Sequence, residues 1–264
     1  MATAPRDTAA RPWRTATRLV AAGLVAAALF WLFLARPTGP GDGQADTGTT
    51  TALATGTPAV GALFVDSGEH FCTASVVHSP GRNLAMTAAH CVSGGGDISF
   101  VPGFVDGRRP LGTWPVTRVV LDPAWTDGGD PDVDVGFLLL GDLDGQRIED
   151  VVGAHQLGLD RGFEQRVRMT GYPDDRDAPI TCTHDTERYS AHQLMIRCPG
   201  FTDGTSGGPW ITDADPATGL GTVIGAIGGF EEGGGTAGVS YSTYFDHRIG
   251  DLYQRAITPP TVTR

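Results

Sequence analysis

The chain has 264 residues, of which 40% are hydrophobic, and its 30 acidic against 19 basic residues give a formal net charge of −11. The apolar fraction is too high for a disordered chain, and the 38 glycines follow no collagen period. The charge is uneven: residues 1–36 hold five arginines and one aspartate, whereas residues 37–264 hold 14 arginines and 29 acids. Phosphate contacts need a basic face, so an acidic body of this kind argues against nucleic-acid binding.

The first element in chain order is an uncharged apolar run of 17 residues, 19–35, preceded by Arg11, Arg14 and Arg18. As a helix it would span about 26 Å, close to the ~30 Å hydrocarbon core of a bilayer. The preceding arginines predict that residues 1–18 stay in the cytoplasm and that the body is exported. We expect an uncleaved anchor, because Phe33 stands where signal peptidase needs a small residue. A cleaved signal peptide remains the alternative.

Residues 36–58 are rich in Gly, Thr and Pro and show no apolar period, which predicts a linker or stalk. Within them, Ala52-Leu53-Ala54 would suit a signal peptidase but lies far from the apolar run. The folded body is therefore expected to span residues 59–264.

The body is predicted to be all-β, because short apolar or alternating runs recur between Gly- and Pro-rich turns. Examples of such runs are residues 60–65, 72–77, 83–87, 116–121, 133–140, 167–171, 193–198, 209–212, 222–228 and 238–244. One helix is expected at the end, where an apolar stripe recurs at helical spacing through Ile249, Leu252, Tyr253 and Ala256.

Four cysteines in an exported body can pair in three ways. Nearest-neighbour pairing, Cys72 with Cys91 and Cys182 with Cys198, would close two short loops. A zinc site that includes His70 and His90 is an alternative, but the cysteine and histidine spacings of zinc sites are absent. We therefore expect no metal and no cofactor.

Three stretches combine residue types that serve nucleophilic catalysis: Thr87-Ala88-Ala89-His90-Cys91, Asp130-Pro131-Asp132-Val133-Asp134, and Gly204-Thr205-Ser206-Gly207-Gly208-Pro209. A serine hydroxyl becomes a useful nucleophile when a neutral imidazole takes its proton. The imidazole needs a carboxylate on its other nitrogen, and the tetrahedral oxyanion needs backbone N–H groups. Gly204 and Gly207 permit unusual backbone angles beside Ser206, so the N–H groups of Gly204 and Ser206 are the expected oxyanion donors.

Each stretch has an alternative interpretation. Asp130 and Asp132 compete with Asp134, but only Asp134 directly precedes an apolar run, so the other two are expected to be turn residues. The same acids resemble the start of a calcium loop, yet Val135 occupies the position that needs glycine. The remaining six histidines are expected to be surface or structural: His70, His78, His155, His184, His192 and His247.

These stretches resemble the trypsin/chymotrypsin family of serine proteases over about residues 59–257, in the family's order His, Asp, Ser. The resemblance implies two six-stranded antiparallel β-barrels with a short C-terminal helix. It also implies that His90 is the general base, Asp134 its orienting carboxylate and Ser206 the nucleophile. Cys72–Cys91 resembles the family's disulfide beside the histidine. The short segment between Asp134 and Ser206 is more like bacterial members, and the arginine-only, Gly- and Asp-rich composition is similar to that of secreted actinobacterial proteins.

The sequence also departs from the family. Many members carry an aspartate before the serine, which pairs with a newly cut N-terminus, whereas this chain has Thr205. We therefore expect activity without N-terminal insertion.

By resemblance, Gly200 and Phe201 form the base of the specificity pocket and Gly228 and Gly229 form an open edge for a peptide strand. Trypsin-like members place an aspartate at the position of Gly200, so tryptic specificity does not follow. A small or apolar side chain is expected at the cleaved position. Asp203, Glu231 and Glu232 either favour basic subsites or are solvated loop acids, the second being the interpretation we favour.

The sequence thus predicts a serine endopeptidase that is exported, either membrane-anchored or secreted, and acts on protein or peptide substrates. It is expected to bind no nucleic acid and to be a monomer. A catalytically silent homologue that binds a protein partner is the alternative function, although none of the three catalytic residue types is lost.

Overall fold

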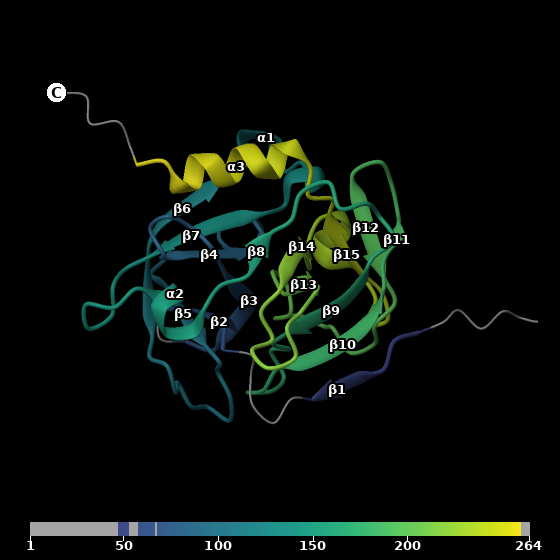
Figure 1. The fold of residues 1–264 in the computed structure, drawn as a ribbon. Helices are drawn as coiled ribbons and strands as arrows, with labels where there is room; N and C mark the ends of the chain where they lie inside the picture. Colours follow the sequence, from purple (N-terminus) through teal and green to yellow (C-terminus); the bar gives the residue numbers. More distant parts are fainter. Residues whose placement is uncertain (1–46, 53–57, 67, 260–264) are drawn as a thin grey trace, which may run out of the picture. The chain divides into compact units, whose positions relative to one another are not determined.

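The computed structural model describes residues 47–52, 58–66 and 68–259, all within one compact unit of the chain (Figure 1). The apolar run 19–35 and most of the predicted linker lie outside the described residues. Within the described part, no helix is both long and apolar enough to cross a membrane.

The N-terminal half of this unit is a closed barrel of six antiparallel strands. Around the barrel the order is β2-β3-β4-β7-β6-β5. The strands are β2 (Val60–Val65), β3 (His70–Val77), β4 (Leu84–Thr87), β5 (Ile98–Pro102), β6 (Trp114–Leu121) and β7 (Gly136–Leu140). Its interior is filled by buried apolar side chains such as Leu63, Ala74, Phe100 and Leu138, which accounts for the apolar runs in the sequence.

The C-terminal half contains two sheets. The larger has the order β1-β10-β9-β13-β14-β8, and the smaller has the order β11-β12-β15. The larger sheet is built from β1 (Thr50–Ala52), β8 (Gln156–Leu157), β9 (Arg166–Gly171), β10 (Ile180–Asp185), β13 (Pro209–Thr212) and β14 (Thr222–Ala226). The smaller sheet is built from β11 (Glu187–Arg188), β12 (Gln193–Ile196) and β15 (Ser240–Thr243).

The pairing in this half differs from the second closed antiparallel barrel that the resemblance implied. Strand β8 pairs with β14 in parallel. Between β14 and β15 a side chain replaces part of the ladder: Ala226 N donates to Ser242 Oγ over 2.9 Å. The Ser242 side chain fits there because Gly225 has no Cβ; one would lie 2.7 Å from Ser242 Oγ. The barrel of the N-terminal half and the all-β class are confirmed, whereas the described strands of the C-terminal half form two sheets.

Strand β1 lies within the range predicted as an irregular linker. It pairs with the edge strand β10 in the register Thr50–Cys182 to Ala52–Ile180 (Figure 1). Just before it, Gly48 N donates to Arg197 O over 2.9 Å. A Cβ at Gly48 would collide with Cys182 Sγ. The segment thus covers a sheet edge that would otherwise present unpaired backbone groups, which the local composition does not reveal.

Besides the strands, the described residues form three α-helices, among them α2 (Ile148–Val152), and two short 3-10 turns, η1 (Pro131–Val133) and η2 (Phe230–Gly233). Helix α3 (His247–Ile257) begins at its N-cap Asp246, and its buried face packs against Phe137 and other core residues of the barrel. Figure 1 shows α3 lying across β6 and β7. Helix α1 (Pro123–Gly128) occupies a stretch predicted as turn; Asp122 caps it and proline stands in its first turn.

Candidate active site

His90 and Asp134 are held together by two hydrogen bonds. The carboxylate of Asp134 accepts from His90 Nδ1 over 2.8 Å and from the His90 backbone N–H over 2.9 Å. A third donor, the N–H of Gly229, reaches the same carboxylate over 2.8 Å. The Asp134 side chain is fully buried, while that of His90 is 13% exposed. A carboxylate only accepts hydrogen bonds, so Nδ1 carries the proton and Nε2 presents its lone pair.

The three aspartates that competed for the role of the carboxylate, Asp130, Asp132 and Asp134, differ in their hydrogen-bond partners. Asp130 caps the short helical turn η1 (Pro131–Val133) by accepting from Asp132 N. The Asp132 carboxylate accepts from Gln193 Nε2 over 2.8 Å. Asp134 alone contacts the histidine, as the apolar run behind it indicated.

Ser206 lies in a tight turn that packs against the strand leading to His90. The Ser206 carbonyl accepts from Thr73 N over 2.8 Å. A Cβ at Gly207 would collide with Thr73 O and lie 2.9 Å from Ala88 N, and Gly207 has a φ of +80°. Only glycine fits there, because the turn touches the backbone of the histidine segment. In the described residues no hydrogen bond joins the Ser206 hydroxyl to His90; such contacts often tighten only when substrate binds.

The backbone N–H groups of the Ser206 turn divide into two sets. Thr205, Gly207 and Gly208 donate to Thr202 O, Ile227 O and Thr205 O. The N–H groups of Gly204 and Ser206 donate to no acceptor in the described part of the chain. These are the two N–H groups that were predicted from the sequence to donate to an oxyanion.

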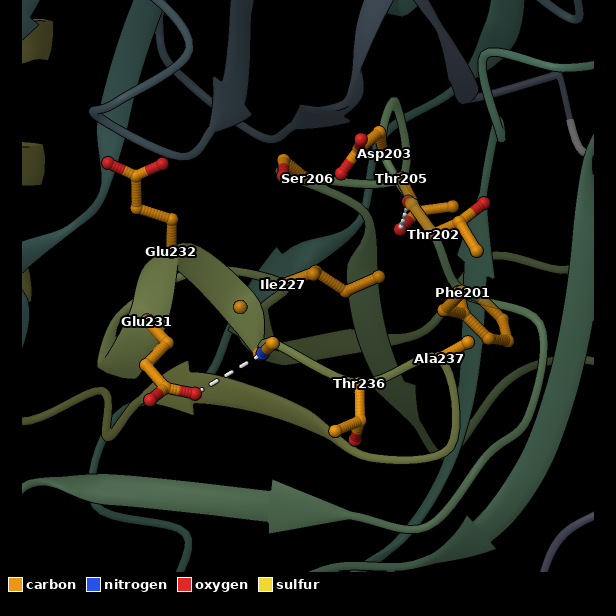
Figure 2. A pocket seen from close by; sticks show the side chains of 13 residues that line it. Phe201, Thr202, Asp203, Thr205, Ser206, Ile227, Glu231, Glu232, Thr236 and Ala237 are labelled. Atoms are coloured by element: carbon orange, nitrogen blue, oxygen red, sulfur yellow. Dashed lines mark hydrogen bonds between the residues drawn. The ribbon is translucent and has the colours of Figure 1, made fainter.

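A cavity of about 340 Å³ opens beside Ser206 (Figure 2). Side chains of Phe201, Ile227, Thr236 and Ala237 face it, with the glycine segment 233–235 between them. Three acids, Asp203, Glu231 and Glu232, also line it, and the carboxylate of Glu231 accepts from Gly235 N over 3.3 Å. The lining of the cavity therefore combines apolar and acidic side chains.

Three residues assigned to the substrate cleft, Gly200, Gly228 and Gly229, are not among those that line this cavity. The Gly200 N–H donates to Ala237 O over 2.7 Å. The predicted open edge at Gly228 and Gly229 is not open on its donor side. Gly228 N donates to Tyr241 O, while Gly229 N donates to Asp134. These bonds join segments far apart in the sequence, so the run of glycines could not indicate them.

Sequence reasoning missed Thr73, which ties the Ser206 turn to the N-terminal barrel. Its hydroxyl donates to Gly204 O over 3.0 Å and accepts from Tyr172 N over 2.9 Å. The Thr73 carbonyl in turn accepts from the Thr87 hydroxyl. The position of Thr73 directly after Cys72 was the only available hint.

Both predicted disulfides are confirmed: Cys72 bonds to Cys91 and Cys182 bonds to Cys198. The first brings strand β3 next to His90, since Cys72 Sγ, Cys91 Sγ and a ring nitrogen of His90 lie within 4.8 Å of one another. Three of the four residues considered as a zinc site thus form a disulfide beside a histidine, and the fourth, His70, bonds to Pro173 O instead.

No family model and no curated protein matches the sequence. Solved structures do. Protease Anisep from Arthrobacter nicotinovorans is 22% identical with a TM-score of 0.69, covering 79% of this chain and 99% of its own. The thermostable serine protease AL20 from an extremophilic microorganism is 24% identical with a TM-score of 0.66, covering 76% and 97%. A Glu endopeptidase is 15% identical with a TM-score of 0.63, covering 81% and 98%. The chain therefore has the chymotrypsin-like fold of bacterial serine proteases.

Proposed function

We propose that this protein is a serine endopeptidase that uses Ser206 as nucleophile, His90 as general base and Asp134 as orienting carboxylate. The observation that carries the proposal is the buried Asp134 carboxylate bound to His90 Nδ1, beside the turn that holds Ser206. The two free N–H groups of that turn support it, because they supply what a tetrahedral oxyanion needs.

In the first half of the reaction, His90 Nε2 takes the hydroxyl proton of Ser206 as Oγ attacks the peptide carbonyl carbon. The carbonyl oxygen becomes an oxyanion and accepts from the N–H groups of Gly204 and Ser206. Asp134 stabilises the imidazolium through Nδ1–H. The C–N bond then breaks, the imidazolium gives its proton to the leaving amine, and an acyl-enzyme remains.

In the second half, water replaces the leaving amine. His90 takes a proton from the water as its oxygen attacks the acyl carbon. The imidazolium then returns the proton to Ser206 Oγ as the acid product leaves. No atom beyond substrate, water and these residues is required.

The cavity beside Ser206 supports a small or apolar side chain at the cleaved position. Phe201, Ile227 and Ala237 provide apolar contacts within about 340 Å³. The acids at the cavity, Glu231 and Glu232 among them, would repel a glutamate side chain, so we expect no preference for glutamate of the kind that the name of the Glu endopeptidase states. Efficient cleavage after Arg but not after Ala or Leu would contradict the apolar assignment.

We place the enzyme outside the cytoplasm, attached through residues 19–35 or released. Two disulfides support an oxidising compartment. Cleavage after Ala54 would remove strand β1 from the sheet, so retention of residues 47–52 is expected in the mature protein. Membrane fractionation with N-terminal sequencing separates the two forms.

The test of the proposed function is digestion of an undirected peptide library, read by mass spectrometry. Wild type is compared with Ser206→Ala and with Ser190→Ala, a serine away from the cavity. We expect internal peptide-bond cleavage by wild type and Ser190→Ala and its loss in Ser206→Ala. A folded wild type that cleaves nothing would contradict the proposal and favour the silent binding homologue.

A further inference from the structure

His70 is a buried histidine at the start of β3 whose hydrogen bond points toward the nucleophile turn. Its side chain is 3% exposed, and its ring packs among Phe64, Phe104 and Tyr172 at centroid distances of 5.5–6.4 Å. Within this apolar surround, Nε2 lies 3.0 Å from Pro173 O. A carbonyl only accepts, so Nε2 carries a proton and donates it.

The hydrogen bond continues through two peptide groups. The carbonyl of Pro173 belongs to the same peptide as the N–H of Asp174, and this N–H donates to Asp203 O over 2.9 Å. The carbonyl of Asp203 in turn belongs to the same peptide as the N–H of Gly204. In a trans peptide the C=O and N–H point in opposite directions. The Gly204 N–H is therefore aimed away from Asp174, and it has no acceptor in the described residues.

Close packing holds this arrangement in one register. Gly204 has a φ of +85°, and a Cβ there would lie 2.6 Å from both Asp174 N and Tyr172 O. The 173–177 loop is also bonded to the segment after β5, because Asp106 N donates to Asp177 O over 2.6 Å. The Asp177 carboxylate lies 4.0 Å from His70 Nδ1. The loop that orients Gly204 is thus held by His70 at the start of β3 and by Asp106, which follows β5.

We propose that His70 is a positioning residue of the oxyanion hole, acting through the peptides Pro173–Asp174 and Asp203–Gly204. This inference rests on the proposed serine endopeptidase function. Two peptide dipoles and one imidazole N–H align head to tail, with the positive end at Gly204 N–H. Hydrogen bonds in such a chain polarise one another, so the donor gains strength as well as direction. Without the His70 donor, the first hydrogen bond of this chain is lost, the Gly204 N–H is less polarised, and the oxyanion loses part of its stabilisation.

The test compares His70→Met with His70→Gln in the full-length chain. The two side chains have the same length, but only Gln has an N–H donor for Pro173 O. The substrate is the p-nitroanilide of the peptide that the library assay selects. The ligands are the trifluoromethyl ketone of the same peptide, which forms an oxyanion on Ser206, and its trifluoromethyl carbinol, which forms none.

We expect kcat of His70→Met to fall about tenfold, less than the 10²–10³-fold that follows removal of an oxyanion donor itself. The inhibition constant of the ketone should rise by the same factor, whereas KM and the inhibition constant of the carbinol change less than threefold. His70→Gln should recover most of kcat. Purely structural damage would instead weaken carbinol and ketone together.

Equal kcat and an equal ketone-to-carbinol ratio in His70→Met and wild type would overturn the inference while leaving the protease function intact. A wild type that neither cleaves the substrate nor binds the ketone would overturn the proposed function and the inference with it. If Met at position 70 prevents folding, His70→Phe, which keeps an aromatic ring and lacks the donor, replaces it in the same comparison.

Discussion

The hydroxyl of Thr73 donates to the carbonyl oxygen of Gly204 over 3.0 Å, and these two residues lie 131 positions apart. The same hydroxyl accepts from Tyr172 N. One buried side chain in the N-terminal barrel thus fixes both the nucleophile turn and the strand end beside it. The geometry of the proposed catalytic residues therefore depends on how the two halves of the unit meet as well as on the three residues themselves.

Replacing Thr73 by Val tests this connection, because valine keeps the shape and removes the hydroxyl. Two buried backbone groups would lose their partner, so we expect unfolding to become easier by about 2 kcal/mol. The shift of the Gly204 turn should lower kcat about tenfold. Denaturant unfolding and steady-state kinetics measure both effects, and Thr73→Ser should restore both. Wild-type kcat in Thr73→Val would contradict the connection.

Asp134→Asn tests the orienting role of the carboxylate. The amide cannot accept from all three N–H donors that Asp134 serves, and its NH₂ disfavours the tautomer with a proton on Nδ1. We expect kcat/KM to fall about 10⁴-fold, a figure known from this substitution in trypsin-like proteases rather than derived from this chain. The matched control is Asp132→Asn, two residues away and bound to Gln193. Comparable losses in both variants would contradict the assignment.

The hydrogen bond of Thr205 leads to a prediction about activation by a newly cut N-terminus. Its hydroxyl donates to Thr202 O over 2.6 Å, and the residue is buried, so a neutral local bond holds the position before Ser206 (Figure 2). We expect Thr205→Val to lose about 1 kcal/mol of stability and to keep kcat/KM within tenfold of wild type. Activity measured together with intact mass checks this. An enzyme that becomes active only when proteolysis creates a new N-terminus would contradict it.

His155 makes the folded state sensitive to acid. Burial, with a smaller contribution from Arg168, lowers the pKa of His155 to about 4, while its hydrogen bond from Gly221 N acts in the opposite direction. The unfolded chain binds a proton near pH 6.5, which the folded chain does not bind until about pH 4. Above pH 6.5 His155 is neutral in both states and does not lower the free energy of unfolding. As the pH falls from 6.5 toward 4, the unfolded chain takes up the proton first, and the free energy of unfolding decreases by on the order of 3 kcal/mol.

His155→Asn keeps an acceptor for Gly221 N and removes the titration. We expect the difference in unfolding free energy between pH 7 and pH 4 to shrink by about that amount, as measured by denaturant titration at each pH. The exposed His247→Asn serves as control and should leave the difference unchanged. An unchanged difference in His155→Asn would show that this histidine is not the acid-sensitive group.

Local patterns predicted most strands and the residues of the site, because each depends on short-range chemistry. The run 60–65 coincides with β2, and the helical stripe through Ile249 and Leu252 coincides with α3. The pairing of His90 with Asp134 was implied by the family resemblance, and the apolar run directly after Asp134 distinguished it from Asp130 and Asp132. Strand β10 (Ile180–Asp185) was missed because polar residues alternate through it, and its identity depends on pairing with β9 and β1.

What could not be predicted are contacts between segments far apart in the chain. The N–H groups of Gly228 and Gly229 donate to Tyr241 O and to the Asp134 carboxylate, so the donor side of the glycine run that indicated an open edge is occupied. His70 was expected to be surface or structural because nothing beside it in the sequence suggests catalysis. Its bond to Pro173, 103 residues away, exists only once both halves of the unit have folded together.

The central claim is that Ser206 is a nucleophile activated by His90, and covalent labelling with a fluorophosphonate tests it most directly. Labelled protein is digested and the modified residue is identified by mass spectrometry, with wild type, Ser206→Ala, His90→Ala and Ser190→Ala treated alike. The account predicts one adduct on Ser206 in wild type and Ser190→Ala, none in Ser206→Ala, and labelling slowed by orders of magnitude in His90→Ala. A folded wild type without an adduct on Ser206, or one labelled equally fast without His90, would contradict it.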